Sequence, residues 1–296
     1  MPGCCKGSQE GLKIPWTFVR VGSSPTPGTK FSAKIYNKYK TMYEKIYDFC
    51  KVRNLGTIFK NTDSPTPRVQ FLLVLLEELG VEYELDKFPI KQPRYSPTGE
   101  ETIFGYNIIM KGQSDKMVVA HHDIVNPSTD NANDNSASVI NAISLKTLRP
   151  EINVVLLDGE EMGGLGSQRC SDLIKEGYFG SISWVLNLEL TGRGGKHFFI
   201  GNYPGKLFDH IKSIFDCPVF KTPFNDSVIF RKNGIDSVVI NPLPPIVGIP
   251  SIIEFSEGVT LDHSLLFNCH TPKDTIETIS TDDMKEFVEE ILLNIV

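Results

Sequence analysis

Residues 136–190 read SASVINAISLKTLRPEINVVLLDGEEMGGLGSQRCSDLIKEGYFGSISWVLNLEL and alternate between helical and strand-like patterns. We predict helices in SASVINAISLKTL and SQRCSDLIKEGY, and buried strands in INVVLLD and SWVLNLEL. Regular alternation of this kind indicates a largely parallel sheet that is covered by helices on both faces.

The remaining patterns extend this alternation in both directions. Further helices are predicted between residues 33 and 53, after Ser64, at 206–215 and at 282–296, and further strands at 81–90, 102–112, 117–123, 197–201 and 236–240. The first of these strands look like a hairpin, which would form an antiparallel edge. We therefore predict a single-domain three-layer α/β/α fold with a mixed, mostly parallel central sheet of about eight strands.

The N-terminal segment has a different composition. It contains GSSPTPGT (Gly22–Thr29) and little apolar periodicity. Such segments bury too little apolar surface to fold, so we predict a disordered tail over residues 1–32 and a folded domain over residues 33–296. GSSPTPGT also matches the translated end of a transfer-RNA gene, an alternative in which the protein would start at Met42.

Composition and charge argue against several classes of protein. Of the 296 residues 40% are hydrophobic and 22% are charged, as in ordinary globular proteins. The net charge of -6 argues against nucleic acid and anionic membranes as partners, and no apolar run approaches the ~20 residues of a membrane span. The six cysteines show no CxxC spacing and the start lacks the apolar core of a signal peptide, so we expect a cytoplasmic protein. The sequence does not define an oligomeric state.

Five polar clusters follow or interrupt the predicted strands and loops. They are AHHD (Ala120–Asp123), NDN (Asn133–Asn135), GEE (Gly159–Glu161), NLE (Asn187–Glu189) and CHTPKD (Cys269–Asp274). An open α/β sheet gathers its site residues at the carboxyl ends of its strands. Five clusters rich in His, Asp and Glu, without matching cysteines, indicate a hydrolytic metal site.

The first two clusters each have a functional and a purely structural interpretation. His121 and Asp123 are two apart, so in a strand both point to the same side, and Asp123 could orient the His121 ring for metal binding. Taken alone, a polar strand end explains this pair better. Asp134 precedes a predicted helix, where capping is the simpler role, although a carboxylate there can also bridge two metals about 3.5–4 Å apart.

The later clusters also have two interpretations. Glu160 and Glu161 follow an apolar strand and precede GGLGS, where glycine lets the backbone turn sharply. Their side chains diverge, so one could bind a metal while the other accepts a proton, unless both are solvated loop acids. Glu189 ends another apolar strand and needs a partner, either a metal or Arg193. An isolated histidine such as His270 is more often structural.

Taken together, these residues suffice for two zinc ions per chain. The set comprises two histidines and three carboxylates: His121, His270, Asp134, Glu161 and Glu189. Each ion would receive one histidine, one private carboxylate and half of the shared aspartate, with a position left for water. Two dications, three carboxylates and one bridging hydroxide sum to zero charge, which favours a partly dry cleft.

The order of the motifs resembles the zinc metallo-exopeptidase family. HxD, NDN, GEE followed by GS, an acid after NL, and HTPxDT occur here in the order found in two-zinc leucyl aminopeptidases, glutamate carboxypeptidase and glutaminyl cyclase. The similarity runs from about Tyr106 to Ile279, and GEE and HTPxDT are its most specific parts. It implies that residues 33–296 form a zinc exopeptidase-like catalytic domain.

The resemblance also implies a role for each site residue. The implied ligands are His121, Asp134 and Glu189 at one zinc, and Asp134, Glu161 and His270 at the other. It further implies Glu160 as the general base, Asp123 as the acid behind the histidine ligand, and a cis peptide after Asp134.

Two positions depart from the family pattern. Glu189 stands where aspartate is usual, which extends the side chain by about 1.5 Å. Ser227, after Asp226, stands where several relatives carry a histidine that helps to hold the substrate. The first departure bears on zinc binding and the second on the substrate class.

The expected function is that of a zinc-dependent exopeptidase, more specifically an aminopeptidase acting on peptides or small aminoacyl substrates. Water activated by the metals would attack the carbonyl, with Glu160 as general base. Two alternatives stay open: glutaminyl cyclase-like acyl transfer, which needs one zinc, and a non-catalytic binding protein on the same scaffold. The complete ligand set argues against the first, and the retained Glu160 argues against the second.

Overall fold

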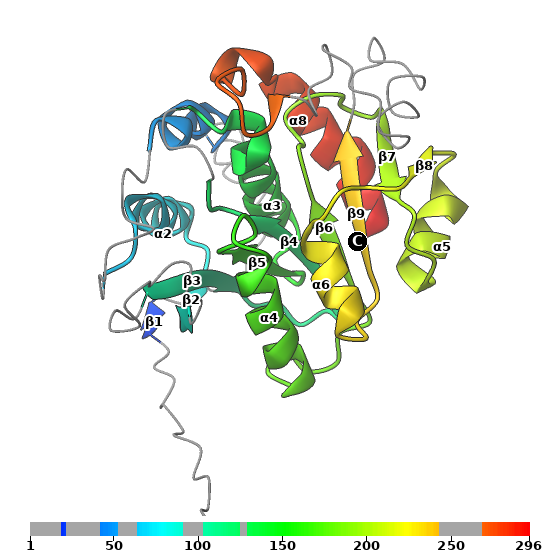
Figure 1. The fold of residues 1–296 in the computed structure, drawn as a ribbon, viewed down its shortest axis with the longest axis horizontal. Coiled ribbons are helices and arrows are strands. Elements are labelled where there is room, and N and C mark those ends of the chain that lie inside the picture. The colour runs from blue at the N-terminus through cyan, green and yellow to red at the C-terminus, as the bar shows by residue number, and fades with distance from the viewer. Residues whose placement is uncertain (1–18, 22–41, 53–63, 91–102, 125–128, 243–267) are drawn as a thin grey trace, which may run out of the picture.

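The computed structural model describes residues 19–21, 42–52, 64–90, 103–124, 129–242 and 268–296. Within these residues, nine strands form one sheet in the order β1-β2-β3-β5-β4-β6-β9-β7-β8, with helices on both faces (Figure 1). The predicted three-layer α/β/α fold with a mixed central sheet is therefore confirmed. No helix in the described part of the chain is both long and apolar enough to cross a bilayer.

Four parallel strands make up the middle of the sheet. They are β5 (Asn153–Leu157), β4 (Lys116–His121), β6 (Trp184–Leu188) and β9 (Ser237–Pro242). Nearly all of their residues are buried, as expected for parallel strands covered on both faces. Because the strands run the same way, the residues that follow β4, β5 and β6 meet at one edge of the sheet.

Antiparallel pairs flank this parallel centre on both sides. On one side β2 (Tyr83–Ile90) pairs with β3 (Ile103–Met110), and β3 pairs with β5. On the other side β7 (Phe198–Gly201) runs antiparallel to β9, and β8 (Val219–Phe220) runs parallel to β7.

The outermost strand lies in the segment for which disorder was predicted. β1 (Val19–Val21) pairs antiparallel with β2, and its three residues raise the number of strands above the eight or so expected. The rest of residues 1–32 lies outside the described residues, so the tail stays a prediction.

Two groups of helices cover the two faces of the sheet. One group comprises α3 (Ala137–Leu148), α5 (Lys206–Ile214), α8 (Thr281–Glu286), η5 (Phe287–Leu292) and α9 (Leu293–Ile295). The other comprises α4 (Leu165–Lys175) and α6 (Asp226–Lys232). The sheet separates two hydrophobic cores, and alternate residues of β4 pack into each of them. Val118 and Ala120 pack in one core, and Met117 and Val119 pack in the other.

Helix α2 (Pro67–Leu79) shows how local sequence defines a helix. The Thr66 hydroxyl accepts a hydrogen bond from the Val69 amide at 3.3 Å, and Pro67 occupies the first helical position. Gly80 ends the helix with a left-handed backbone (φ 64°). In the helix expected between residues 33 and 53, residues 42–51 are helical and the others lie outside the described residues.

Candidate metal centre

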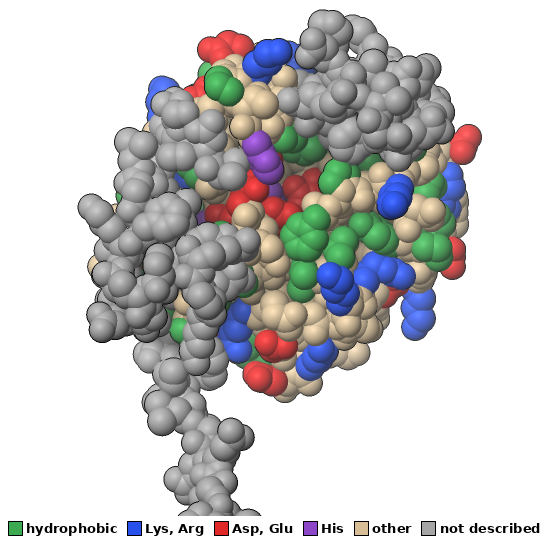
Figure 2. All heavy atoms as spheres, in the orientation of Figure 1, with side chains coloured by type: hydrophobic (Ala, Val, Ile, Leu, Met, Phe, Trp, Pro, Cys, Tyr) green, Lys and Arg blue, Asp and Glu red, His purple; other side chains and the backbone are tan. Residues whose placement is uncertain are grey.

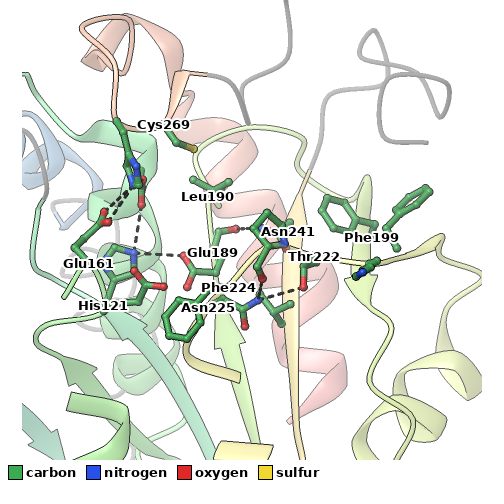
Figure 3. A pocket seen from close by; sticks show the side chains of 17 residues that line it. His121, Glu161, Glu189, Leu190, Phe199, Thr222, Phe224, Asn225, Asn241 and Cys269 are labelled. Carbon is green, nitrogen blue, oxygen red and sulfur yellow. Dashed lines mark hydrogen bonds and ion pairs between the residues drawn. The ribbon is translucent and has the colours of Figure 1, made fainter. Parts of the chain in front are cut away.

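Four of the five predicted ligands follow strands or precede a helix at the carboxyl edge of the parallel strands. His121 is the last residue of β4, Glu189 directly follows the last residue of β6, and Glu161 lies in the turn after β5. Asp134 lies in the tight turn η1 (Ala132–Ser136) that leads into α3. His270 approaches from the C-terminal segment, and Figure 3 shows His121, Glu161 and Glu189 converging on one pocket.

The two oxygens of Asp134 face two different histidines. Asp134 Oδ1 lies 3.3 Å from His121 Nε2, and Oδ2 lies 3.2 Å from His270 Nε2. Because each oxygen has its own imidazole, the carboxylate has the arrangement that a bridge between two metal ions requires. The alternative role as a helix cap is not seen, since no side-chain capping hydrogen bond is present at the start of η1 or of α3.

A second carboxylate accompanies each histidine. Glu189 Oε2 lies 3.4 Å from His121 Nε2, and Glu161 Oε2 lies 3.0 Å from His270 Nε2. The predicted residues thus form two groups of one histidine and two carboxylates, which share Asp134. Ligand atoms of His121, Asp134 and Glu161 lie within 4.8 Å of one another. Nitrogen and carboxylate oxygen in these numbers are donors that suit zinc.

The electrostatics of the cluster favour bound cations. Burial disfavours the charged form of Asp134, yet His121 and His270 hold the pKa of this carboxyl well below its usual range. In return, Asp134 and Glu161 raise the pKa of His270 to about 10. Burial lowers the pKa of His121, but Glu189, Asp123 and Asp134 raise it well above the usual value. Three acids around two imidazoles therefore need positive charge, which protons or metal ions can supply.

Hydrogen bonds from distant segments hold Asp134 in place. The Asp274 carboxylate accepts the backbone amides of Asn133 at 2.8 Å and of Asp134 at 3.0 Å. The Asp134–Asn135 peptide is cis, as the family resemblance implied. Burial raises the pKa of Asp274 to about 6, although the two amides lower it. The sequence placed Asp274 within a motif but assigned it no role.

Glu189 is oriented by two asparagine amides. Asn135 Nδ2 donates to Glu189 Oε2 at 2.9 Å, and Asn187 Nδ2 donates to Oε1 at 3.1 Å. Arg193, the alternative partner, instead donates from Nε to the Thr278 carbonyl. The spacing NxE could have suggested the role of Asn187, whereas nothing in the sequence indicated that of Asn135.

Asp123 connects the first histidine to the glutamate pair. Its Oδ1 lies 3.4 Å from His121 Nδ1, on the far side of the ring from Asp134, as predicted. Its two oxygens also accept the backbone amides of Glu160 and Glu161 at 3.2 and 3.1 Å. Asp123 therefore fixes the ring of His121 and the turn after β5 at once.

The Glu160 side chain takes a different course from that of its neighbour. It lines the pocket and, within the described residues, forms no ion pair, whereas Glu161 contacts His270. Burial raises the pKa of Glu160 to about 10; His121 opposes this, and Glu189, Asp226 and Asp123 add to it. Asp226, fully buried at the start of α6, is a nearby acid to which the sequence assigned no role.

A pocket of about 220 Å³ adjoins the cluster. Its described lining contains the five predicted ligands, Glu160, and the side chains Leu190, Phe199, Phe220, Lys221, Thr222, Pro223, Phe224, Asn225, Val239, Asn241 and Cys269. Figure 2 shows acidic side chains gathered in a hollow beside a hydrophobic patch. Ser227 does not line it, and its hydroxyl instead pairs with that of Ser237 at 3.0 Å.

Comparisons with solved structures agree with this fold. The zinc aminopeptidase BSAP of Bacillus subtilis is 21% identical with a TM-score of 0.50, over 70% of this chain and 55% of that one. The LapA aminopeptidase of Legionella pneumophila is 14% identical with a TM-score of 0.58, over 97% and 78%. The glutaminyl cyclase of Porphyromonas gingivalis is 17% identical with a TM-score of 0.60, over 88% and 97%. This chain thus spans about half the length of the Bacillus enzyme.

The family assignment comes from the sequence. Residues 107–295 match the description of peptidase family M28, and the chain belongs to this family. A search of curated proteins found no match.

Proposed function

We propose that this protein is a two-zinc aminopeptidase that removes N-terminal residues from peptides. The observation that carries the proposal is the position of Asp134, whose two oxygens face two different histidines, while one further carboxylate lies against each of those histidines. On this proposal His121, Asp134 and Glu189 would hold one ion, and Asp134, Glu161 and His270 would hold the other. Cys50, Cys170 and Cys217 form no disulfide within the described residues, and we retain a cytoplasmic location as a proposal.

The residues around the metal cluster then have definite roles. Zinc, when bound, would lower the pKa of a water and polarise the substrate carbonyl. A Glu160 carboxylate oxygen would take a proton from the attacking water and return it to the nitrogen of the leaving amine. Asp123 keeps the His121 ring oriented and holds the turn that carries Glu160. Positive charge from bound ions would favour the ionised Glu160, which burial and the surrounding acids disfavour.

Removal and return of metal test the proposal. We expect a phenanthroline-type chelator to abolish cleavage of aminoacyl anilides, and added zinc to restore it. Elemental analysis should find close to two zinc ions per chain. Activity that persists in fully metal-free protein would contradict the proposal.

Glutaminyl cyclisation is the second candidate, because the cyclase from Porphyromonas gingivalis shares the fold over 88% of this chain. The two reactions differ in their product: hydrolysis releases a free amino acid, whereas cyclisation of N-terminal glutamine releases ammonia and leaves the peptide intact. Incubation with a glutamine-initiated peptide and mass spectrometry distinguish them. One zinc per chain together with loss of ammonia would favour the cyclase.

A further inference from the structure

Four residues on one face of the sheet, Phe199, Phe220, Val239 and Asn241, line the pocket beside the candidate metal cluster, and we call them the pocket floor. Val239 and Asn241 are two apart on β9 and therefore point to the same side. Phe199 is the register partner of Asn241 on β7, and its ring packs edge-on against Phe220 of β8 at 5.4 Å. All four residues line the pocket. The floor is thus apolar except for a single amide, which belongs to Asn241.

The orientation of that amide is determined by its neighbour. Asn241 Nδ2 donates to the backbone carbonyl of Glu189 at 3.1 Å, a contact drawn in Figure 3. A carbonyl oxygen only accepts, so the nitrogen must face it and Oδ1 is left on the other branch of the amide. Asn241 is only 5% exposed, and Oδ1 has no hydrogen-bond partner in the described part of the chain. A buried acceptor without a donor is costly, which points to a donor that arrives with a ligand.

We propose that this floor binds the side chain of the substrate residue next to the cleaved bond, and that Asn241 Oδ1 accepts a hydrogen bond from it. The substrate class is an uncharged, largely apolar side chain with an O–H or N–H donor, of which tyrosine is the best match. The inference rests on the proposed peptidase function and adds a specificity-determining residue to it.

Charge excludes the other classes of side chain. An acidic side chain would place its carboxylate oxygens against Asn241 Oδ1, which is also an acceptor, and would be repelled. A cationic side chain needs a carboxylate partner when it is desolvated. Outside the cluster and Glu160, the described lining residues offer one charged group, the exposed Lys221. A purely apolar side chain fits the rings but leaves Oδ1 unsatisfied.

Matched substrates test the proposal, because tyrosine and phenylalanine differ only by the hydroxyl. We expect the zinc-loaded protein to show a kcat/KM about tenfold higher for the tyrosyl than for the phenylalanyl 4-nitroanilide, the scale of one buried acceptor gaining its donor. In Asn241→Leu this ratio should fall to about one. Phe220→Leu is the control: it reduces ring packing for both substrates and should preserve the ratio.

Each outcome decides the matter. A ratio near one in the unmodified protein overturns the inference, whether or not the variants fold. A ratio that survives in Asn241→Leu, or equal losses for both substrates, also overturns it, because the acceptor would then serve another group. Zinc content and circular dichroism show whether Asn241→Leu is folded, and Asn241→Ser provides a second removal of the acceptor.

Binding separates this inference from the proposed function. Affinities of tyrosinamide and phenylalaninamide for Glu160→Gln, measured by calorimetry, report on the floor without turnover. Preference for tyrosinamide without any hydrolysis by the parent protein would refute the peptidase and keep the floor assignment. Hydrolysis by the parent protein without a preference for tyrosinamide would support the peptidase function and refute the floor assignment.

Discussion

At the scale of single residues, two adjacent glutamates with the same backbone support have different surroundings. Both backbone amides are bound by Asp123, but Glu161 reaches His270 while Glu160 lines the pocket. The alternation of side-chain direction at consecutive positions therefore separates a proposed ligand from a proposed base. Glu160 can exchange a proton without loss of a contact within the metal cluster.

We predict that Glu160→Gln lowers turnover by at least ~10²-fold, the usual scale of general base catalysis, and keeps the zinc content. The amide has the size of the carboxyl but accepts no proton from water. Glu161→Gln is the matched comparison and should lose zinc, because it removes a charged ligand. Full activity of Glu160→Gln would move the role of base to another residue.

A second prediction concerns Asp274, which we infer to be a positioning residue. Asp274→Asn keeps the size of the side chain but presents an NH₂ group to one of the two backbone amides. The backbone at Asp134 should then shift, and zinc affinity should fall about 10–100-fold, as for other groups that orient ligands. Titration against a zinc indicator measures this. Asp283→Asn is the control. Asp283 also accepts a hydrogen bond from a backbone amide, that of Gly194, but does so away from the centre, so this variant should leave zinc affinity unchanged.

The candidate ligands could be predicted from the sequence, but their supports could not. His121, Glu161 and Glu189 directly end or follow predicted strands, so the chain order itself brings them to one edge. The contacts of Asp274 with Asn133 and of Asn135 with Glu189 join residues that are 141 and 54 positions apart. No local pattern encodes such pairs, because they depend on how the helices and the C-terminal segment pack.

At the scale of elements, the glycines after the glutamate pair fix how α4 leaves the sheet. Gly163 and Gly164 have positive φ of 100° and 77°, as the predicted sharp turn requires. Gly166 is needed for a different reason, because the helix backbone lies very close to its neighbours there. A Cβ at this position would lie 2.4 Å from the Asp158 carbonyl oxygen and 2.5 Å from Asn107 Oδ1. The first turn of α4 therefore packs directly against the end of β5.

We predict that Gly166→Ala destabilises the protein by about 1–3 kcal/mol, the range for overpacking at a site that does not yield. The displaced strand end precedes Glu160, so zinc affinity should fall as well. Gly177→Ala is the control: its φ of 77° makes alanine unfavourable, but no atom lies within 4 Å of the added Cβ. Denaturant unfolding and zinc titration should show that Gly177→Ala loses stability only. Equal zinc affinity in both variants would contradict the predicted link between packing at Gly166 and zinc binding.

Long, periodic elements could be predicted and short ones could not. The helices α2, α3 and α4 and the four central strands occur where the patterns placed them. β8 has two residues and β1 has three, which is too short for a periodic pattern. Such strands exist because a neighbouring strand offers free backbone groups, and this depends on the tertiary fold.

At the scale of the whole molecule, the sheet order brings acids from distant parts of the chain together. The central order β5-β4-β6-β9 places the ends of β4, β5 and β6 side by side, and the C-terminal segment adds His270. The sequence indicated parallel strands but not their order, which depends on how the crossover helices are shared between the faces. Gathering three carboxylates is unfavourable unless cations accompany them.

The last prediction follows from competition between protons and zinc for this cluster. In the metal-free protein the pKa of His270 is raised to about 10 and that of His121 well above its usual value, so both imidazoles hold protons at neutral pH. Protonated histidines stabilise the metal-free fold fully below about pH 6.5, the usual unfolded pKa. That stabilisation is lost as the pH rises through the folded pKa of about 10.

Zinc needs neutral imidazole, so its affinity must rise over the same interval of pH. We therefore expect the zinc-induced increase in Tm to be larger at pH 8 than at pH 6, and zinc binding to release protons, which calorimetry in two buffers of different ionisation enthalpy would count. His270→Gln should release about one proton fewer, because one protonated ligand is missing. An increase in Tm that is equal at both pH values would show that zinc binds elsewhere, away from these histidines.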